Sequence, residues 1–132
     1  MTRCILIEPN KDAQIIYLED TSYKTIKSII KGIIGRTPVA GMPHFYILAD
    51  DEFLYKEGLD FNRRLDNYLF YGTLLVVNED PDDPEAEGYI SLTDEQVEWT
   101  MQNLGKAPDP SETPTEQEKM DYIKGAVSFY SF

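Results

Sequence analysis

Three consecutive polar residues carry the groups best suited to binding chemistry: Asn62, Arg63 and Arg64. We predict that Asn62 is the N-cap of a short helix or helical turn over residues 62–70, with the amides of both arginines in its first turn. Helix N-termini attract anions, and a guanidinium binds a phosphate or a carboxylate in a fork. The three residues therefore predict a site for a small molecule or a nucleotide.

A structural role for Arg63 is the alternative interpretation. Two acids precede it closely in the sequence, Glu57 and Asp60, and an ion pair with either one would hold the loop in place. Arginine suits such a pair because its planar fork matches the geometry of a carboxylate. The sequence leaves both interpretations open.

Acidic residues form a second candidate site in residues 79–88. Its candidates for binding a partner are Asp80, Asp82, Asp83, Glu85 and Glu87. Their spacing lacks the central glycine of an EF-hand, so we interpret the segment as a solvated loop rather than a calcium site. We expect its carboxylates to contact a basic surface on another protein.

The distribution of charge extends this acidity over the C-terminal part of the chain. The net charge is −12; residues 1–75 hold nine basic and ten acidic residues, whereas residues 76–132 hold three basic and fourteen acidic ones. Binding to nucleic acid depends on basic residues that neutralise phosphates. We therefore expect no direct nucleic acid binding, and a protein partner with a basic surface.

The residue types needed for catalysis are not grouped in the sequence. The single histidine, His44, and the single cysteine, Cys4, lie in different segments, so they do not predict a nucleophile beside its base. Gly32 and Gly35 fall in and at the end of a predicted helix, unlike the glycines of a phosphate-binding loop. We expect no enzymatic activity, no cofactor and no metal site.

The expected location is the cytoplasm, with no membrane association. One cysteine cannot form a disulfide within the chain, which fits a reducing compartment. Residues 1–10 lack the features of a secretory signal, and no apolar run reaches the roughly 20 residues that span a bilayer.

A helix over Thr21–Gly35 is predicted to organise the fold. Its apolar residues follow the spacing of one helix face: Ile26, Ile29, Ile30, Ile33 and Ile34. Three lysines fall on the opposite, solvated side: Lys24, Lys27 and Lys31. We expect a sheet to pack against the isoleucines.

Strand patterns surround this helix. They cover Arg3–Glu8, Gln14–Glu19, His44–Ala49, Phe53–Tyr55 and Gly72–Asn78, and a loop is expected over Thr37–Pro43. The last strand is apolar on both faces, which predicts a central position. The order of elements is that of an α+β, β-grasp-like (ubiquitin-like) fold, in which a mixed sheet wraps one central helix. Another two-layer α+β sandwich would fit the same order.

Two capping boxes mark helices in the C-terminal part. Thr93 with Gln96 starts a helix that ends at Gly105, and Thr115 with Glu118 starts another that ends near Gly125. A short strand is also expected at Tyr89–Ser91. Residues 1–104 therefore predict one α+β domain, and residues 105–132 a proline-rich linker, a helix and an aromatic tail. The tail, residues 126–132, is expected to dock on the domain or on a second copy, which would give a homo-oligomer.

Several motifs resemble those of a known family. They are Gly58–Arg63, Tyr71–Thr73 before an apolar strand, Gly88–Gln96, and Glu8-Pro9 after the first strand. Over about residues 3–104 the chain resembles the family named domain of unknown function 3846. Asp51-Glu52 replaces a glycine-containing turn that is usual in this family, and the chain after residue 105 is an extension. The resemblance implies a protein carried by phages, plasmids or other mobile elements of bacteria, without a known biochemical activity.

Two classes of function remain open. The first is a non-enzymatic accessory protein of a phage or other mobile element, which binds a host or defence protein in the bacterial cytoplasm through its acidic face. A variant of this class is an inhibitor that mimics DNA. The second class is a small-molecule or nucleotide-binding domain that uses Asn62, Arg63 and Arg64.

Overall fold

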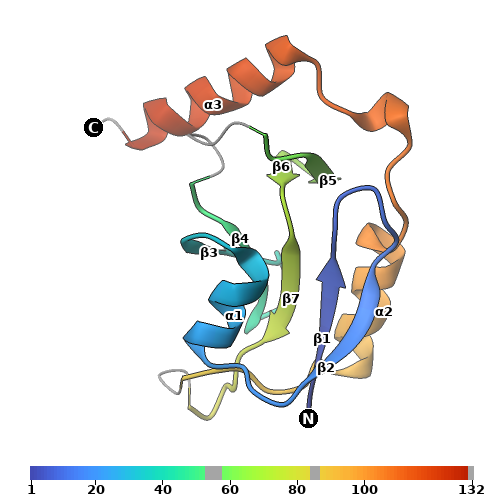
Figure 1. The fold of residues 1–132 in the computed structure, drawn as a ribbon, viewed down its shortest axis with the longest axis vertical. Coiled ribbons are helices and arrows are strands. Elements are labelled where there is room, and N and C mark those ends of the chain that lie inside the picture. The colour runs from blue at the N-terminus through green and yellow to red at the C-terminus, as the bar shows by residue number, and fades with distance from the viewer. Residues whose placement is uncertain (53–57, 84–86, 131–132) are drawn as a thin grey trace.

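The computed structural model describes residues 1–52, 58–83 and 87–130. The elements, in chain order, are β1 (Thr2–Ile7), β2 (Gln14–Leu18), α1 (Tyr23–Ile30), β3 (Ile34–Pro38), β4 (Phe45–Asp50), β5 (Phe61–Leu65), β6 (Tyr68–Tyr71), β7 (Leu74–Asn78), α2 (Asp94–Leu104) and α3 (Glu116–Tyr130). A short 3-10 turn, Pro110–Glu112, lies between the last two helices. This confirms the α+β class (Figure 1).

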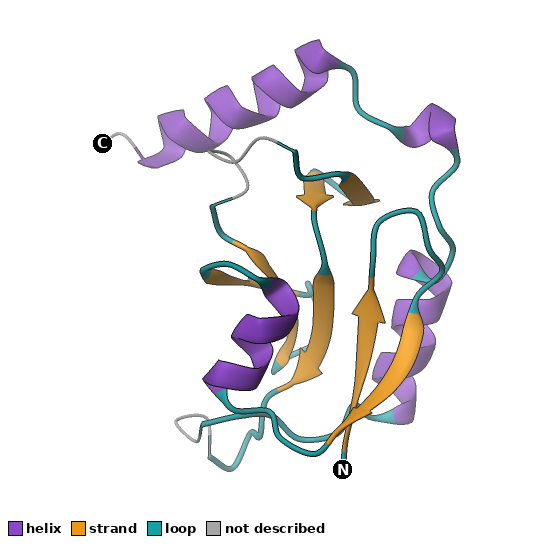
Figure 2. Ribbon diagram, in the orientation of Figure 1, coloured by secondary structure: helices purple, strands orange, loops and turns teal. Residues whose placement is uncertain are grey.

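Five strands form one sheet in the order β2-β1-β7-β4-β3, and β5 with β6 forms a separate hairpin (Figure 2). β7 is central, as its apolar sequence predicts. The mixed sheet that we expected is wrong for the described strands, because each pairing among them is antiparallel. The β-grasp topology is therefore not confirmed.

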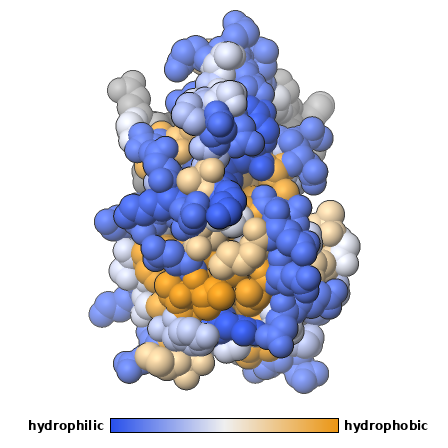
Figure 3. Space-filling model, turned by 90° about the vertical axis from the view of Figure 1, so that its right-hand side faces the viewer, coloured by the Kyte–Doolittle hydropathy of each residue, from blue (hydrophilic) through white to orange (hydrophobic). Residues whose placement is uncertain are grey.

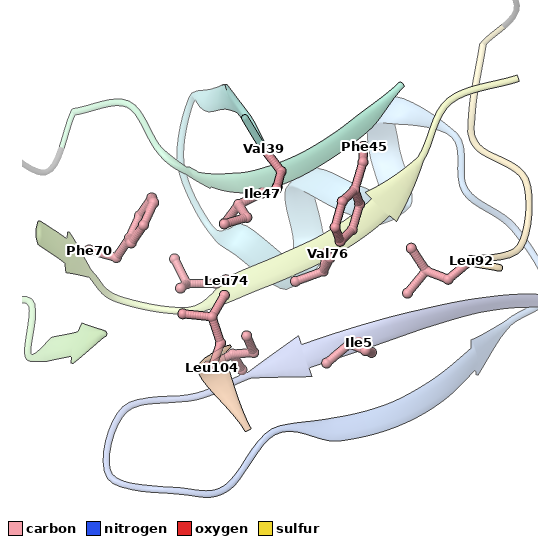
Figure 4. Close-up of a cluster of buried hydrophobic side chains, with 10 residues drawn as sticks. Ile5, Val39, Phe45, Ile47, Phe70, Leu74, Val76, Leu92 and Leu104 are labelled. Carbon is pink, nitrogen blue, oxygen red and sulfur yellow. The ribbon is translucent and has the colours of Figure 1, made fainter. Parts of the chain in front are cut away.

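Helices cover both faces of the sheet. Strand side chains alternate between the two faces, so β7 contributes Leu75 and Val77 to one core with Ile26 and Ile30 of α1. Leu74 and Val76 point the other way, into a core with Leu92 and with Leu104 of α2 (Figure 4). The arrangement therefore has three layers rather than the two layers of the alternative sandwich.

Helix α1 is shorter than predicted. It ends at Ile30, Lys31 adopts a left-handed conformation with φ of 62°, and Ile34 already belongs to β3. The predicted loop over Thr37–Pro43 is likewise wrong at its start, because β3 continues to Pro38. The physical reason is the pairing of β3 with β4, which begins with Ile34 opposite Asp50 and places these residues in the sheet. Only Ile26 and Ile30 of the predicted stripe are fully buried, whereas Ile33 is 51% exposed.

Residues 62–70 form a hairpin instead of the predicted helix. β5 and β6 pair on either side of Asp66 and Asn67, and Asp66 has a φ of 50°, which Asp tolerates better than most residues. Turn-forming residues between two short apolar-rich segments are the sequence signal of such a hairpin. The prediction gave more weight to Asn62 as a helix cap.

The C-terminal helices begin where the capping boxes predict. The Thr93 box is complete, with both reciprocal hydrogen bonds. At the second box, the Thr115 hydroxyl accepts from the Glu118 amide, but the Glu118 side chain bonds to Arg64 instead. Helix α3 continues to Tyr130, beyond the expected end near Gly125. None of the helices in the described part of the chain is long and apolar enough to cross a membrane.

Four predictions fall wholly or partly outside the described residues. They concern the strand Phe53–Tyr55, the acid Glu57 as a partner of Arg63, the acid Glu85, and the docking of the aromatic tail, whose side chains are not described. At the expected short strand Tyr89–Ser91, Ile90 forms an isolated antiparallel bridge with Asn78.

Candidate functional site

Asn62 is fully buried, and two of its three side-chain hydrogen bonds join β5 to other segments of the chain. Its Nδ2 donates to the carbonyl of Ile7, at the end of β1, over 2.8 Å, and to the carbonyl of Gly72, just before β7, over 2.7 Å. Its Oδ1 accepts from Arg63 over 2.9 Å. The predicted role as a helix N-cap is therefore wrong, since Asn62 holds the hairpin to the main sheet.

Arg63 is also buried, with 3% of its surface exposed. Its Nε donates to the carbonyl of Leu104, the last residue of α2, over 2.9 Å, and its second terminal nitrogen donates to the carbonyl of Lys11 over 2.6 Å. Burial lowers the pKa of Arg63, and the charges of Asp12 and Glu112 oppose that shift. Arg63 thus has a structural role, as in the alternative interpretation, but its partners are backbone carbonyls rather than Asp60, and the other expected acid, Glu57, lies outside the described residues.

A bulge in β5 explains how two neighbouring residues both face inward. The pairing with β6 shifts between Phe61 and Arg63, so the regular alternation of side chains is interrupted at Asn62. Arg64 then points outward. The sequence gives no signal of this irregularity, which is why the three residues were expected to act together.

Arg64 holds α3 through a forked ion pair with Glu118, which we call the Arg64–Glu118 clasp. The two guanidinium nitrogens lie 2.6 and 3.0 Å from the two carboxylate oxygens, and one also donates to the carbonyl of Glu112 over 3.0 Å. The hydrogen bond raises the pKa of Arg64 and lowers the pKa of Glu118. Beside it, the Lys119 ammonium lies 5.1 Å from the centre of the Tyr71 ring. The clasp shows that Arg64 can bind a carboxylate in the predicted fork.

The described residues of the acidic loop, 79–83 and 87–88, lie near the start of α1 (Figure 1). Asp82 and Asp83 are exposed. The carboxylate of Asp80 accepts from the amide of Asp82 over 2.9 Å, which shapes the loop. Glu87 accepts from the amide of Tyr23, the first residue of α1, over 3.3 Å. The candidates are therefore not equivalent, because Glu87 supports the helix while Asp82 and Asp83 face solvent.

The carboxylate of Glu79 lies close to the side chains of Arg36 and His44, a grouping that the sequence did not predict. Its Oε2 lies 3.2 Å from a guanidinium nitrogen of Arg36 and 3.6 Å from Nδ1 of His44. Arg36 also stacks on Tyr46, with 4.0 Å between the guanidinium carbon and the ring centre. Within the part of the chain that the structure describes, no three His, Cys, Asp or Glu residues group as metal ligands.

The comparison with known proteins yields one family. No curated protein and no solved structure matches the chain significantly. A family model described as "Domain of unknown function (DUF3846)" matches residues 1–105, which extend from β1 to the end of α2. Asn62, Arg63 and the carbonyls that bind them all lie within this range. The chain therefore belongs to the family of domain of unknown function 3846.

Proposed function

We propose that this chain is a non-enzymatic protein-binding module that uses its acidic surface to contact a basic surface of a partner. The observation that carries this proposal is that the polar side chains of the first candidate site are bound inside the protein, whereas carboxylates of the second are exposed to solvent. Asn62 and Arg63 are buried in internal hydrogen bonds, whereas Asp82 and Asp83 extend into solvent. The charged groups left for a partner in these two sites are mainly carboxylates.

The net charge supports the same proposal. At −12, the field of the chain attracts cationic surfaces and repels polyanions. Exposed carboxylates speed association and help to select the partner more than they add affinity. We further propose a phage or mobile-element setting, in which a host or defence protein in the bacterial cytoplasm would be the partner. Mimicry of DNA is a variant of this proposal in which the partner is a DNA-binding protein.

Affinity capture from a bacterial lysate tests the proposal with matched variants. The loop variant is Asp82→Asn with Asp83→Asn, and the control is Glu116→Gln with Asp121→Asn on the exposed side of α3. Both remove two negative charges from exposed positions. Glu87 is left unchanged because it accepts from the first amide of α1. Capture is compared at about 0.1 M and about 1 M salt, where the Debye length is about 10 Å and about 3 Å.

We expect a partner that is recovered at low salt and lost at high salt. The loop variant should recover less of this partner than the control variant does. Equal recovery by both variants would exclude the loop as the contact, and recovery that does not depend on salt would exclude the acidic surface altogether. For the DNA-mimic variant, added duplex DNA should displace the chain from the partner.

A ligand at Arg64 is a second candidate, favoured by the fork of the clasp. An anionic small molecule or nucleotide would have to replace the Glu118 carboxylate. Thermal shift measurements with nucleotides on the Glu118→Gln variant test this candidate. If no nucleotide stabilises that variant more than it stabilises the Arg64→Ala variant, the ligand site is refuted.

A further inference from the structure

Strand β2 is an open edge of the five-stranded sheet. It pairs with β1 over five consecutive residue pairs without a bulge, and it stands last in the strand order, with no described strand on its other side (Figure 1). Alternate backbone amides and carbonyls of an edge strand point away from the sheet. β2 therefore offers a regular row of hydrogen-bonding groups to an added strand.

The two edges of the sheet differ in how they are protected. The opposite edge, β3, contains Arg36 and Pro38, and charged side chains and proline are the usual means of blocking an edge. The sequence of β2, Gln-Ile-Ile-Tyr-Leu, contains neither proline nor a charged residue. Of the two edges, β2 is thus the one open to strand addition.

Exposed apolar side chains accompany the open backbone. Ile15 is 42% exposed and Tyr17 is 58% exposed. They pair with Ile5 and Arg3 of β1, so they lie on the sheet face that α2 covers. Figure 3 views the molecule from the side of β2 and α2, and apolar side chains form a band there between hydrophilic ones. An added strand could bury part of this surface.

The charges around this edge select a basic occupant. Glu19 and Asp20 follow β2 directly, and α2 holds three acids, Asp94, Glu95 and Glu98, without a basic residue. Asp94 is already paired with Arg3, whose guanidinium lies 2.9 Å from its carboxylate, so Glu95 and Glu98 are the acids of α2 without a cationic partner among the described residues. A second copy of this chain would bring another net charge of −12 to the same edge, which like-charge repulsion opposes.

We propose that β2 docks an extended, basic segment of a partner protein, which adds as a strand to the sheet. Backbone hydrogen bonds to β2 would give affinity, apolar side chains of the segment would cover Ile15 and Tyr17, and lysines or arginines at the end of the segment would face Glu19 and the acids at the start of α2. This inference rests on the proposed protein-binding function, but it uses a different surface from the acidic loop.

Synthetic peptides test the inference on the full chain. The probe, called the valine–lysine peptide, is a fluorescent peptide of alternating valine and threonine with lysines at both ends, and the charge control carries glutamates in place of the lysines. A third peptide repeats the probe with N-methyl groups on two adjacent central residues, which blocks pairing on both of its edges without changing its charge. Binding is followed by fluorescence anisotropy, and amide hydrogen exchange of residues 14–18 reports where the peptide binds.

Two pairs of protein variants complete the design. Ile15→Thr with Tyr17→Thr removes apolar contacts but keeps residues that suit a strand. Tyr23→Thr with Ile33→Thr is the matched control, since these two residues are 54% and 51% exposed away from β2. We expect binding of the valine–lysine peptide, slower exchange in β2, and about tenfold weaker binding by the Ile15 and Tyr17 variant alone.

Several results would overturn the inference. They are absence of peptide binding, equal binding of the N-methylated peptide, and protection that appears elsewhere than in β2. Protection of β2 that rises with protein concentration alone would identify a second copy as the occupant. Loss of peptide binding in the Asp82 and Asp83 variant, with β2 unprotected, would refute edge docking while supporting the acidic loop. If the peptide protects β2 and the loop variant captures its partner as well as the control does, edge docking would be supported and the acidic loop would be refuted as the contact.

Discussion

Replacing Asn62 by alanine should destabilise the protein far more than the loss of a helix cap would. The side chain is fully buried, and its removal leaves the carbonyls of Ile7 and Gly72 and one Arg63 donor without their partner. A neutral hydrogen bond contributes about 1 kcal/mol to stability and one to a charged group about 2 kcal/mol. We therefore expect a loss of about 4 kcal/mol in the free energy of unfolding.

Urea unfolding followed by circular dichroism measures this change. The matched control is Asn103→Ala, which removes an exposed asparagine whose amide bonds to one carbonyl, that of Trp99. The control should stay within about 0.5 kcal/mol of the original protein. A loss of only about 1 kcal/mol for Asn62→Ala is what a lost N-cap would cause. That result would refute the buried junction between β1, β5 and β7.

Three further predictions concern the core, the clasp and the cysteine. Ile30→Ala should lower the free energy of unfolding by roughly 2 to 5 kcal/mol, whereas Ile33→Ala should lower it by less than about 0.5 kcal/mol because Ile33 is half exposed. Equal losses for the two variants in urea unfolding would show that α1 extends past Lys31. The hydrogen bond from Arg64 lowers the pKa of Glu118, so the clasp stabilises the folded chain above the ordinary glutamate pKa of about 4.3 and loses this effect as the pH falls through the lower, folded value. Limited proteolysis between α2 and α3 should therefore become faster at acidic pH. An Arg64→Ala variant whose proteolysis shows the same pH profile would contradict this prediction. Burial raises the pKa of Cys4 to about 11, so a thiol reagent should modify it near pH 8 only after unfolding, and rapid modification of the folded chain would show that Cys4 is accessible.

Features set by local sequence could be predicted. The helix α2 starts at its capping box because Thr93 and Gln96 satisfy each other's amides within one turn. The central position of β7 follows from apolar residues on both of its faces. The burial of Ile26 and Ile30 follows from their spacing. The end of α1 could not be predicted in this way, since Ile34 belongs to β3 through its pairing with β4, a strand further along the chain.

Features that depend on distant partners could not be predicted. Arg63 is buried because carbonyls of Lys11 and Leu104 meet around it, and these residues are far from it in the chain. Arg64 forms its fork with Glu118 of α3, a residue of this chain far from it in the sequence, whereas the prediction concerned a bound ligand. Whether β1 runs parallel or antiparallel to β7 depends on the connections between them in the fold. The apolar pattern of a strand is the same in either direction, so the sequence does not distinguish the two.

The association rate with a captured partner tests the central proposal most directly. It should be measured at several salt concentrations for the original chain, for the Asp82→Asn and Asp83→Asn variant, and for the Glu116→Gln and Asp121→Asn control. Binding to a basic surface through the acidic loop predicts a rate that falls as salt rises, and a slower rate for the loop variant than for the control at low salt. A rate that is independent of salt and equal in all three proteins would contradict the proposal.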